Sequence, residues 1–244
     1  PGVAGRLGIE IVVIGEVRPT VNLTGRARPA QPGMSISHVR VPSGTFGALV
    51  KRRDPEDLSL YLLSCSHVLT EYAAPNLGDD IIQPGTSDRG RPADKIAELS
   101  KAVPLLFHDS EYLNRVDAAI AVVNDPTSVS AEIAFLGYCS TVSGRIHRGM
   151  TVSKCGRTTA RSQGKVLDPE ARVRLPYYRA RNSTSLAGFK DVVLCTSFSQ
   201  DGDSGSLVVN SSGEAVGLLM AGSSRTTVFC KMKHVCTDLQ IDLV

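Results

Sequence analysis

The sequence contains no tryptophan, and aromatic residues make up only 5% of its 244 positions. Its 27 basic and 24 acidic side chains leave a net charge of only +3 at pH 7. Arginines gather between positions 145 and 181, but a nucleic-acid-binding face normally combines a strong positive excess with interleaved aromatic residues. We therefore interpret this arginine-rich region as a solvated face and expect no nucleic-acid partner.

Long apolar runs are also absent, since no stretch approaches the ~18 consecutive apolar residues of a membrane-spanning helix. The first residues, PGVAGRLGIEIVVIGEV, lack the charged segment followed by an apolar segment that marks a secretory signal. We therefore expect no membrane association and a cytoplasmic location. Three N-x-S/T triplets, at Asn22, Asn182 and Asn210, keep secretion open.

Cysteine occurs at six positions, but without the spacing of a structural site. There is no C-x₂-C pair, and the closest two cysteines are Cys230 and Cys236. Cys65 and Cys155 lie within apolar runs, where a free thiol behaves as a small hydrophobic side chain. We predict mostly reduced cysteines, no metal site and no cofactor.

Short apolar runs of strand length recur along the chain, and Gly, Pro, Asn, Asp and Ser separate them. With 42% hydrophobic residues, the chain can bury one large core or two smaller ones. Many short strands with frequent turn signals predict an all-β sandwich or barrel. The segment SLVVNSSGEAVGLLM at 206–220 predicts a hairpin, and residues 231–240 predict one closing helix.

The chain shows no internal repeat, but its composition indicates where it divides. A Pro- and Gly-rich stretch at 18–34 predicts an N-terminal arm, which we place at residues 1–35. A break near 124–130 then separates two β-rich halves of similar size, 36–125 and 126–244.

The segment QDGDSGSLVV at 200–209 holds more glycines, acids and serines than a plain turn requires. Nucleophilic catalysis by serine needs a hydroxyl, a base, a carboxylate that orients the base, and backbone N–H groups directed at the oxyanion. Because Gly202 has no Cβ, its N–H and that of Ser204 can point into one pocket. Gly205 then lets the chain turn into the next strand. This pattern favours Ser204 as a nucleophile.

The required base and carboxylate are predicted at His67 and Asp117. His67 ends the apolar run LYLLSCSHVL, a buried strand that leads into a turn. Asp117 begins the apolar run VDAAIAVV, where an unpaired buried charge would be costly. Taken singly, a histidine at a strand end is usually structural, and an aspartate there usually belongs to a turn. Together with Ser204 they favour a catalytic triad.

The order His67, Asp117, Ser204 is that of chymotrypsin-like enzymes, not of subtilisin-like enzymes or α/β-hydrolases. Through CSHVL, VDAAIAV and GDSGSLV, the sequence resembles the chymotrypsin/trypsin-like serine peptidase superfamily. The resemblance implies an all-β fold of two six-stranded antiparallel β-barrels with a short C-terminal helix. His67 and Asp117 would lie in the first barrel (36–125) and Ser204 in the second (126–244).

Other segments narrow the resemblance. SCSHVL, GDDIIQPG, KCGRTTARSQGKV and AVGLLMAGS are similar to a bacterial, intracellular branch of trypsin-like peptidases. In some operons of that branch a protease activates a defence effector, so the resemblance implies antiviral defence as one function. The implied partners are a protein or peptide substrate and a regulatory domain or activating partner.

The superfamily mechanism assigns a role to each residue of the site. Ser204 would attack the scissile carbonyl, His67 would act as base and then as acid, and Asp117 would orient the imidazole. The N–H groups of Gly202 and Ser204 would form the oxyanion hole.

Substrate contacts also follow from the resemblance. Phe198 stands six residues before Ser204, where an acid would give an Arg/Lys preference, so it favours an apolar or small P1 side chain. Met220, Ala221 and Gly222 would pair with the substrate backbone as an added strand.

The sequence departs from the superfamily in two places. SCSHV lacks the usual disulfide beside the histidine, and no I-V-G-G start supplies an amino terminus that could insert beside Asp203. Asp203 therefore requires another cationic or hydrogen-bonding partner. We do not expect activation by N-terminal cleavage, and control by a partner or an attached domain is our hypothesis.

The sequence also bears on functions other than that of a serine endopeptidase. A catalytically silent peptide-binding or scaffold module of the same fold is the alternative, because a badly formed oxyanion loop would not show in the sequence. An α/β-hydrolase esterase is rejected, because a strand follows Ser204 and the histidine comes first. A metal hydrolase is unsupported, because no His/carboxylate cluster has ligand spacing.

Overall fold

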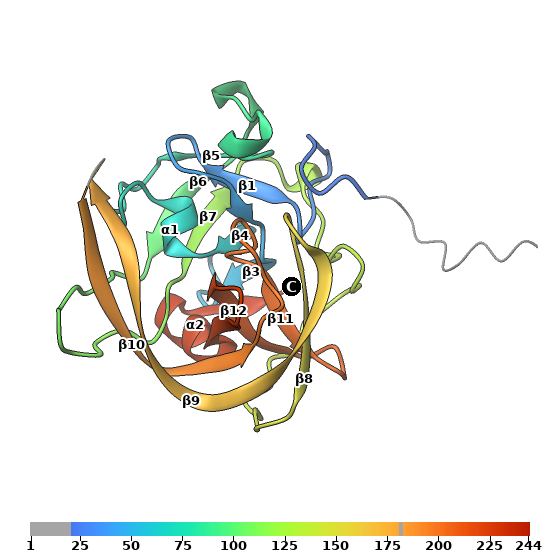
Figure 1. Ribbon diagram of the computed structural model, residues 1–244. Helices are drawn as coiled ribbons and strands as arrows, with labels where there is room; N and C mark the ends of the chain where they lie inside the picture. The colour runs from blue at the N-terminus through green and yellow to red at the C-terminus, as the bar shows by residue number, and fades with distance from the viewer. Residues whose placement is uncertain (1–20, 181–182) are drawn as a thin grey trace, which may run out of the picture.

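The structure is a computed structural model that describes residues 21–180 and 183–244 (Figure 1). Antiparallel strands dominate it and form one half-barrel sheet and one closed barrel. The first 20 residues of the predicted arm (1–35) and Asn182 lie outside the described residues. Neither of the two helices in the described part of the chain is long and apolar enough to cross a membrane.

The first sheet has the strand order β14-β3-β4-β7-β6-β5-β1-β2. Its central strands consist largely of Leu, Ile, Val and Ala, which pack well in a buried, pleated sheet. The short helix α1 (Ser66–Leu69) follows β4 after a single residue, Cys65. The strands are β1 (Ser35–His38), β2 (Gly44–Thr45), β3 (Ala48–Arg52), β4 (Tyr61–Ser64), β5 (Asp80–Ile82), β6 (Lys95–Ala102), β7 (Ala119–Val123) and β14 (Ile241–Leu243).

The second sheet closes into a six-stranded barrel in the order β10-β13-β12-β11-β8-β9. Closure removes the unpaired edges that an open sheet would expose. The strands are β8 (Thr151–Gly156), β9 (Ala160–Ala180), β10 (Ser183–Thr196), β11 (Leu207–Asn210), β12 (Ala215–Gly222) and β13 (Thr226–Lys231).

This architecture confirms the predicted all-β, two-barrel fold, with one difference in the first sheet. That sheet contains eight strands rather than six, because β14 adds to β3 at one edge and the two-residue β2 adds to β1 at the other. Since β14 comes from the end of the chain, the first sheet includes residues from the predicted second half. The exact domain boundaries therefore stay a prediction.

Two local predictions are also confirmed. The predicted hairpin is β11–β12, in which Leu207 lies opposite Leu218. The predicted closing helix is α2 (Met232–Leu239). It buries residues at i, i+3, i+4 and i+7, the spacing of one helical face: Met232, Val235, Cys236 and Leu239.

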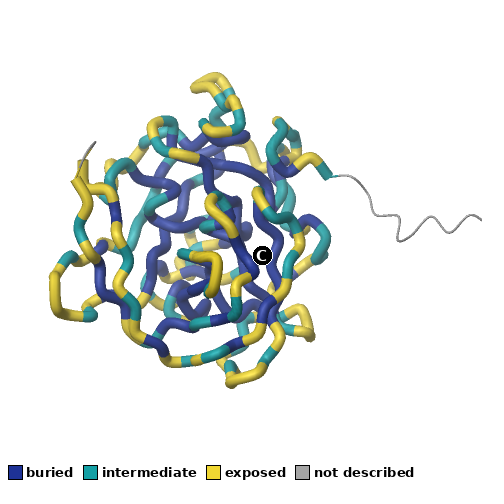
Figure 2. Tube along the Cα trace, viewed as in Figure 1, coloured by how far each residue is buried: buried dark blue, intermediate teal, exposed yellow. Residues whose placement is uncertain are grey.

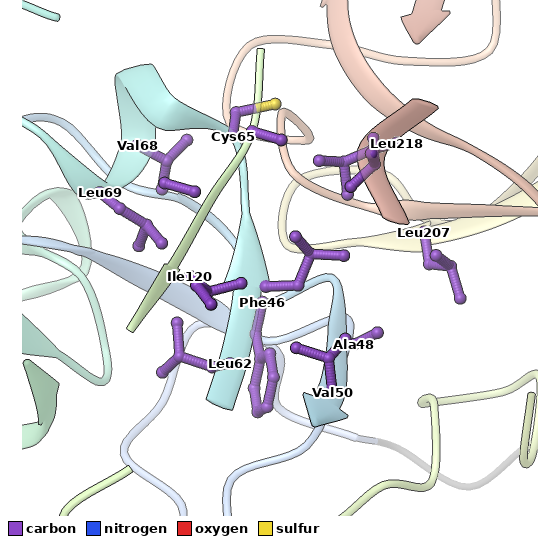
Figure 3. Close-up of a cluster of buried hydrophobic side chains, with 14 of the residues drawn as sticks. Phe46, Ala48, Val50, Leu62, Cys65, Val68, Leu69, Ile120, Leu207 and Leu218 are labelled. Carbon is purple, nitrogen blue, oxygen red and sulfur yellow. The ribbon is translucent and has the colours of Figure 1, made fainter. Parts of the chain in front are cut away.

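One hydrophobic core runs from the first sheet into the second. Figure 2 shows the buried segments at the centre of the molecule and the exposed ones at its loops. In Figure 3, Leu207 and Leu218 of the second barrel belong to the same cluster as Phe46, Leu62 and Ile120 of the first. The two barrels therefore pack together through apolar side chains. All six cysteines of the sequence are buried and free.

Strands β9 and β10 form a long hairpin that extends beyond the barrel (Figure 1). Near its base, β9 also pairs with β8, and β10 also pairs with β13. From Ala171 to the tip, β9 pairs only with β10 in the described structure. The hairpin reaches the first barrel, where the N–H of Asn114 donates to the carbonyl of Gly188 at 3.0 Å.

Candidate active site

His67 and Asp117 come from neighbouring parts of the first sheet. His67 lies in α1 and its side chain is 30% exposed, whereas Asp117, two residues before β7, is fully buried. Strands β4 and β7 are paired with Ser64 opposite Ala119, so this register places the two functional side chains together. The Nδ1 of His67 lies 2.5 Å from Oδ2 of Asp117.

Asp117 accepts two further hydrogen bonds. The backbone N–H of His67 donates to Oδ1 at 3.2 Å, and the phenol of Tyr177 donates to Oδ2 at 2.9 Å. Without donors, a buried carboxylate would be very unfavourable. Asp117 is thus paired, as its place before an apolar strand requires.

The ion pair shifts the pKa of both groups. Burial alone would raise the pKa of Asp117. The charge and hydrogen bonds of His67 and the hydrogen bond from the phenol of Tyr177 together lower it by more than burial raises it, so this pKa lies below its usual value. Burial lowers the pKa of His67, but the charge of Asp117 and the hydrogen bond to it more than offset this effect. The pKa of His67 is therefore raised above its ordinary value of about 6.5.

Ser204 lies on the loop between β10 and β11, and its carbonyl accepts from the N–H of Thr45 at 2.8 Å. A Cβ built on Gly44 would touch both Val68, the residue after His67, and the carbonyl of Ser204. The serine therefore lies beside the helix that carries His67. Its hydroxyl donates to the carbonyl of Met220 at 3.3 Å, and no hydrogen bond joins Ser204 to His67 in the described structure.

The loop before Ser204 forms a tight turn. The N–H of Asp203 donates to the carbonyl of Gln200 at 3.0 Å, which closes this turn. Gly202 has φ of +95°, in the left-handed region that favours glycine. Both Gly202 and Ser204 are partly exposed, so their backbone can face a substrate.

Thr158 fixes the direction of one peptide in this turn. Its hydroxyl donates to the carbonyl of Asp201 at 2.7 Å. Because the C=O and N–H of a trans peptide point in opposite directions, the N–H of Gly202 points away from Thr158. No described residue accepts a hydrogen bond from the N–H of Gly202 or that of Ser204. These two donors are therefore available to an oxyanion.

Asp203 has a cationic partner, which the sequence alone did not identify. The Nζ of Lys154, on β8, lies 3.0 Å from Oδ2 of Asp203, and both side chains are fully buried. The hydroxyl of Thr159 and the backbone N–H groups of Thr158, Thr159 and Gln200 also donate to this carboxylate. Burial raises the pKa of Asp203, but the charge of Lys154 and these hydrogen bonds lower it to below its usual value.

Phe198 is buried and lines a cavity of about 840 Å³ beside the loop. Its ring packs against Gly164, where a Cβ would lie 2.4 Å from Cδ1 of Phe198. Most of the other lining side chains are hydroxyls and amides, and the only charged one among the described residues is Asp201. The lining consists of Thr159, Ser162, Gln163, Ser197, Phe198, Ser199, Gln200, Asp201, Gly222, Ser223 and Ser224.

Met220, Ala221 and Gly222 form the end of β12. Met220 is buried, Ala221 is half-buried and Gly222 is exposed. On one side, the end of this strand pairs with β13. On the other side, the pairing of β11 with β12 stops at Leu218 in the described structure. No further strand of the described structure pairs with the outer side of 220–222.

Cys65 lies close to His67 and Asp117, with their potential ligand atoms within 4.8 Å of one another. The thiol donates to the carbonyl of Leu219 at 3.1 Å, and burial raises its pKa well above its usual value. A metal would need the thiolate and the Nδ1 that His67 directs to Asp117. The donor set thus does not fit a metal ion, and the expectation of no metal and no cofactor stays a prediction.

Sequence reasoning did not identify three residues that contribute to this region: Lys154, Thr158 and Tyr177. A lysine within the apolar run at 149–156 was a readable signal, because a buried charge requires a partner. For Thr158 no signal was readable, and for Tyr177 the alternation of apolar and polar residues from Ala171 to Tyr178 indicated the inner face of a strand but not a contact with Asp117. Their roles depend on which loop of the fold they meet.

No protein-family model and no curated protein matches the sequence. Solved structures do match: a glutamic acid-specific serine protease has a TM-score of 0.61 at 14% identity, covering 88% of this chain and 100% of its own. Protease A of Thermobifida fusca has 0.59 at 15% identity, covering 88% and 99%.

A third structure, Nocardiopsis protease, has a TM-score of 0.60 at 15% identity and covers 88% of this chain and 99% of its own. At such identities the likeness concerns the fold alone. These three structures are chymotrypsin/trypsin-like serine proteases. We conclude that this chain has the chymotrypsin-like double-barrel fold.

Proposed function

We propose that this protein is a serine endopeptidase in which Ser204, His67 and Asp117 form the catalytic triad. The observation that carries the proposal is the buried Asp117, which is bonded to Nδ1 of a partly exposed His67 beside Ser204. With Nδ1 occupied in this way, Nε2 is left to accept a proton. The pair therefore supplies an oriented base next to a hydroxyl.

In the proposed reaction, Oγ of Ser204 attacks the scissile carbonyl carbon while Nε2 of His67 takes the hydroxyl proton. The tetrahedral oxyanion is held by the N–H groups of Gly202 and Ser204. His67 then gives its proton to the leaving amine, which departs and leaves an acyl-enzyme. Water, activated by the same histidine, hydrolyses that ester and regenerates Ser204.

The hydroxyl of Ser204 must leave the carbonyl of Met220 before it reacts. At 3.3 Å this hydrogen bond is long, so a change of the serine rotamer costs little. Catalytic hydrogen bonds in free enzymes are often loose and tighten only when substrate binds. We propose that a substrate strand along 220–222 brings about this rotation.

Substrate selection is proposed from the cavity beside Phe198. By the resemblance, Phe198 corresponds to the position where an acid would bind Arg or Lys, and the lining is otherwise mainly neutral. We therefore expect cleavage at internal peptide bonds of protein chains, after a P1 residue with an apolar or small side chain. Control by a regulatory partner and a role in antiviral defence remain predictions from the resemblance.

The first experiment labels the protein with a fluorophosphonate probe and incubates it with a mixed peptide library. We expect the wild type to be labelled and to cleave peptides, with Ser204→Ala losing at least ~10⁴-fold of the activity. Ser211→Ala, which changes an exposed serine, is the matched control and should remain fully active. An unlabelled wild type would instead favour the silent peptide-binding module.

A further inference from the structure

We propose that Tyr177 is a positioning residue of the triad, which holds Asp117 from a hairpin of the other barrel. The inference rests on the proposed function, because it concerns the same Asp117 and His67. It adds a fourth side chain to the site and a route by which the second barrel acts on the first.

The phenol of Tyr177 shares one oxygen of Asp117 with the imidazole of His67. It donates to Oδ2 at 2.9 Å, and Nδ1 of His67 lies 2.5 Å from the same atom. Besides His67, Tyr177 supplies the only side-chain hydrogen bond to Asp117 in the described structure. Together with the backbone N–H of His67, which holds Oδ1, the phenol therefore helps to set how the carboxylate faces the imidazole.

The ring of Tyr177 is buried and held on several sides. It is 7% exposed and meets the imidazole of His67 edge-on, with ring centroids 5.8 Å apart. Phe107 and Phe189 lie 6.2 Å and 6.0 Å from it by the same measure. Burial and the charge of Asp117 raise the pKa of the phenol well above its usual value, so it remains a donor.

The hairpin that carries Tyr177 is fixed to the first barrel. The side chain of Asn114 donates to the carbonyl of Gly188 at 3.1 Å, and its backbone pairs with the same strand. The guanidinium of Arg174 lies 4.8 Å from the ring of Tyr112, and that of Arg179 lies 4.2 Å from the ring of Phe107. These contacts set the position of the phenol over the carboxylate.

Loss of the phenol has a defined electrostatic consequence. Without this donor, the charge of Asp117 is less dispersed, so the carboxylate attracts the proton of the imidazolium more strongly. The pKa of His67 should then rise further. Because catalysis needs a neutral imidazole, the acid limb of the pH profile should move to higher pH.

The test is Tyr177→Phe, which removes one oxygen and keeps the ring. We expect a fall of roughly 10-fold in kcat at pH 7, KM within about 2-fold, and partial recovery at higher pH. NMR titration of the His67 ring in the resting protein should show the higher pKa. Tyr178→Phe is the control, because that neighbouring side chain is 68% exposed.

The outcomes separate the inference from its alternatives. A Tyr177→Phe protein with an unshifted His67 titration would overturn it, even if stability fell, because a structural role alone does not move that pKa. If Tyr177→Phe fails to fold, site-specific fluorotyrosines replace it: the pKa of His67 should fall as the phenol becomes more acidic, and a flat response overturns the inference. Since the titration needs no turnover, it remains decisive if the protein proves not to be a peptidase.

Discussion

Gly202, like Gly205 in the same loop, is a residue of the site at which backbone and contacts both require glycine. Its φ is +95°, and a Cβ there would lie 2.2 Å from Nη1 of Arg157 and 2.6 Å from Oγ1 of Thr158. An L side chain would therefore have to displace the groups that hold the neighbouring peptide. This crowding explains why the first position of GDSG is a glycine.

Gly202→Ala should therefore lose activity by disturbing the proposed oxyanion hole. We expect kcat to fall by ~10²–10³-fold, the loss typical of one oxyanion donor. Gly213→Ala is the matched control, because Gly213 also has positive φ, at +79°, but has open space around it. Both variants should lose some stability, measured by thermal unfolding. Equal activity of the two variants would count against a catalytic role for this turn.

At the residue scale, sequence reasoning reached the three side chains of the proposed triad. Ser204, His67 and Asp117 stand in recognisable motifs, and the structure brings His67 and Asp117 into contact. Lys154 was not identified, although its place in an apolar run indicated a buried charge. Which acid it would meet could not be read, because Asp203 lies 49 residues away in the chain.

At the scale of elements, the turn between β8 and β9 supports the loop that carries Ser204. It provides the hydroxyl of Thr158 to the carbonyl of Asp201. It also provides the guanidinium of Arg157, whose Nη2 lies 2.7 Å from Oδ1 of Asp88 in the first barrel. One turn thus contacts both the loop and the neighbouring barrel.

Thr158→Val should release the carbonyl of Asp201 while keeping the shape of the side chain. The freed peptide can then rotate and turn the N–H of Gly202 away from the substrate, so we expect kcat to fall ~10-fold with KM little changed. Thr158→Ser should recover most of the rate, and Thr151→Val, at an exposed position of β8, should change nothing. A Thr158→Ser variant as slow as Thr158→Val would contradict this role for the hydroxyl.

Elements were predictable where their signals were local. The β11–β12 hairpin and α2 follow from short patterns, a Gly-containing turn between apolar runs and a helical spacing. The β9–β10 hairpin shows the limit, because β9 spans 21 residues and β10 spans 14, both longer than the short apolar runs from which strands were predicted. Buried or half-buried and exposed side chains alternate from Ala171 to Tyr178, which puts Tyr177 on the inner face of β9. That alternation could not show that Tyr177 meets Asp117, which lies 60 residues away in the chain.

At the scale of the whole molecule, the candidate site lies where the two barrels meet. His67 and Asp117 come from the first sheet, and Ser204 and Tyr177 come from the second. Sequence order and motifs predicted that division. The contacts across it are long-range, and periodicity within one element carries no information about them.

At the scale of the whole molecule, Lys154 also concerns how the loop that carries Ser204 is held in place. It comes from within the closed barrel and neutralises Asp203 beside Ser204, with 0% of either side chain exposed. A cation at this place can hold the loop without a newly cut amino terminus. Because the pKa of Asp203 is lowered, this contribution to stability is present above the ordinary carboxyl value of about 3.9 and is lost as the pH falls through the lowered pKa.

Lys154→Met tests this view, because it removes the charge and leaves Asp203 buried without a counter-ion. We expect unfolding to become easier by about 3–5 kcal/mol and fluorophosphonate labelling to fall with it. Lys165→Met, at an exposed position of β9, should leave both unchanged. Adding Asp203→Asn to Lys154→Met removes the uncompensated charge, so it should restore part of the stability. A Lys154→Met protein that labels as fast as the wild type would mean that the loop is ordered by its hydrogen bonds alone.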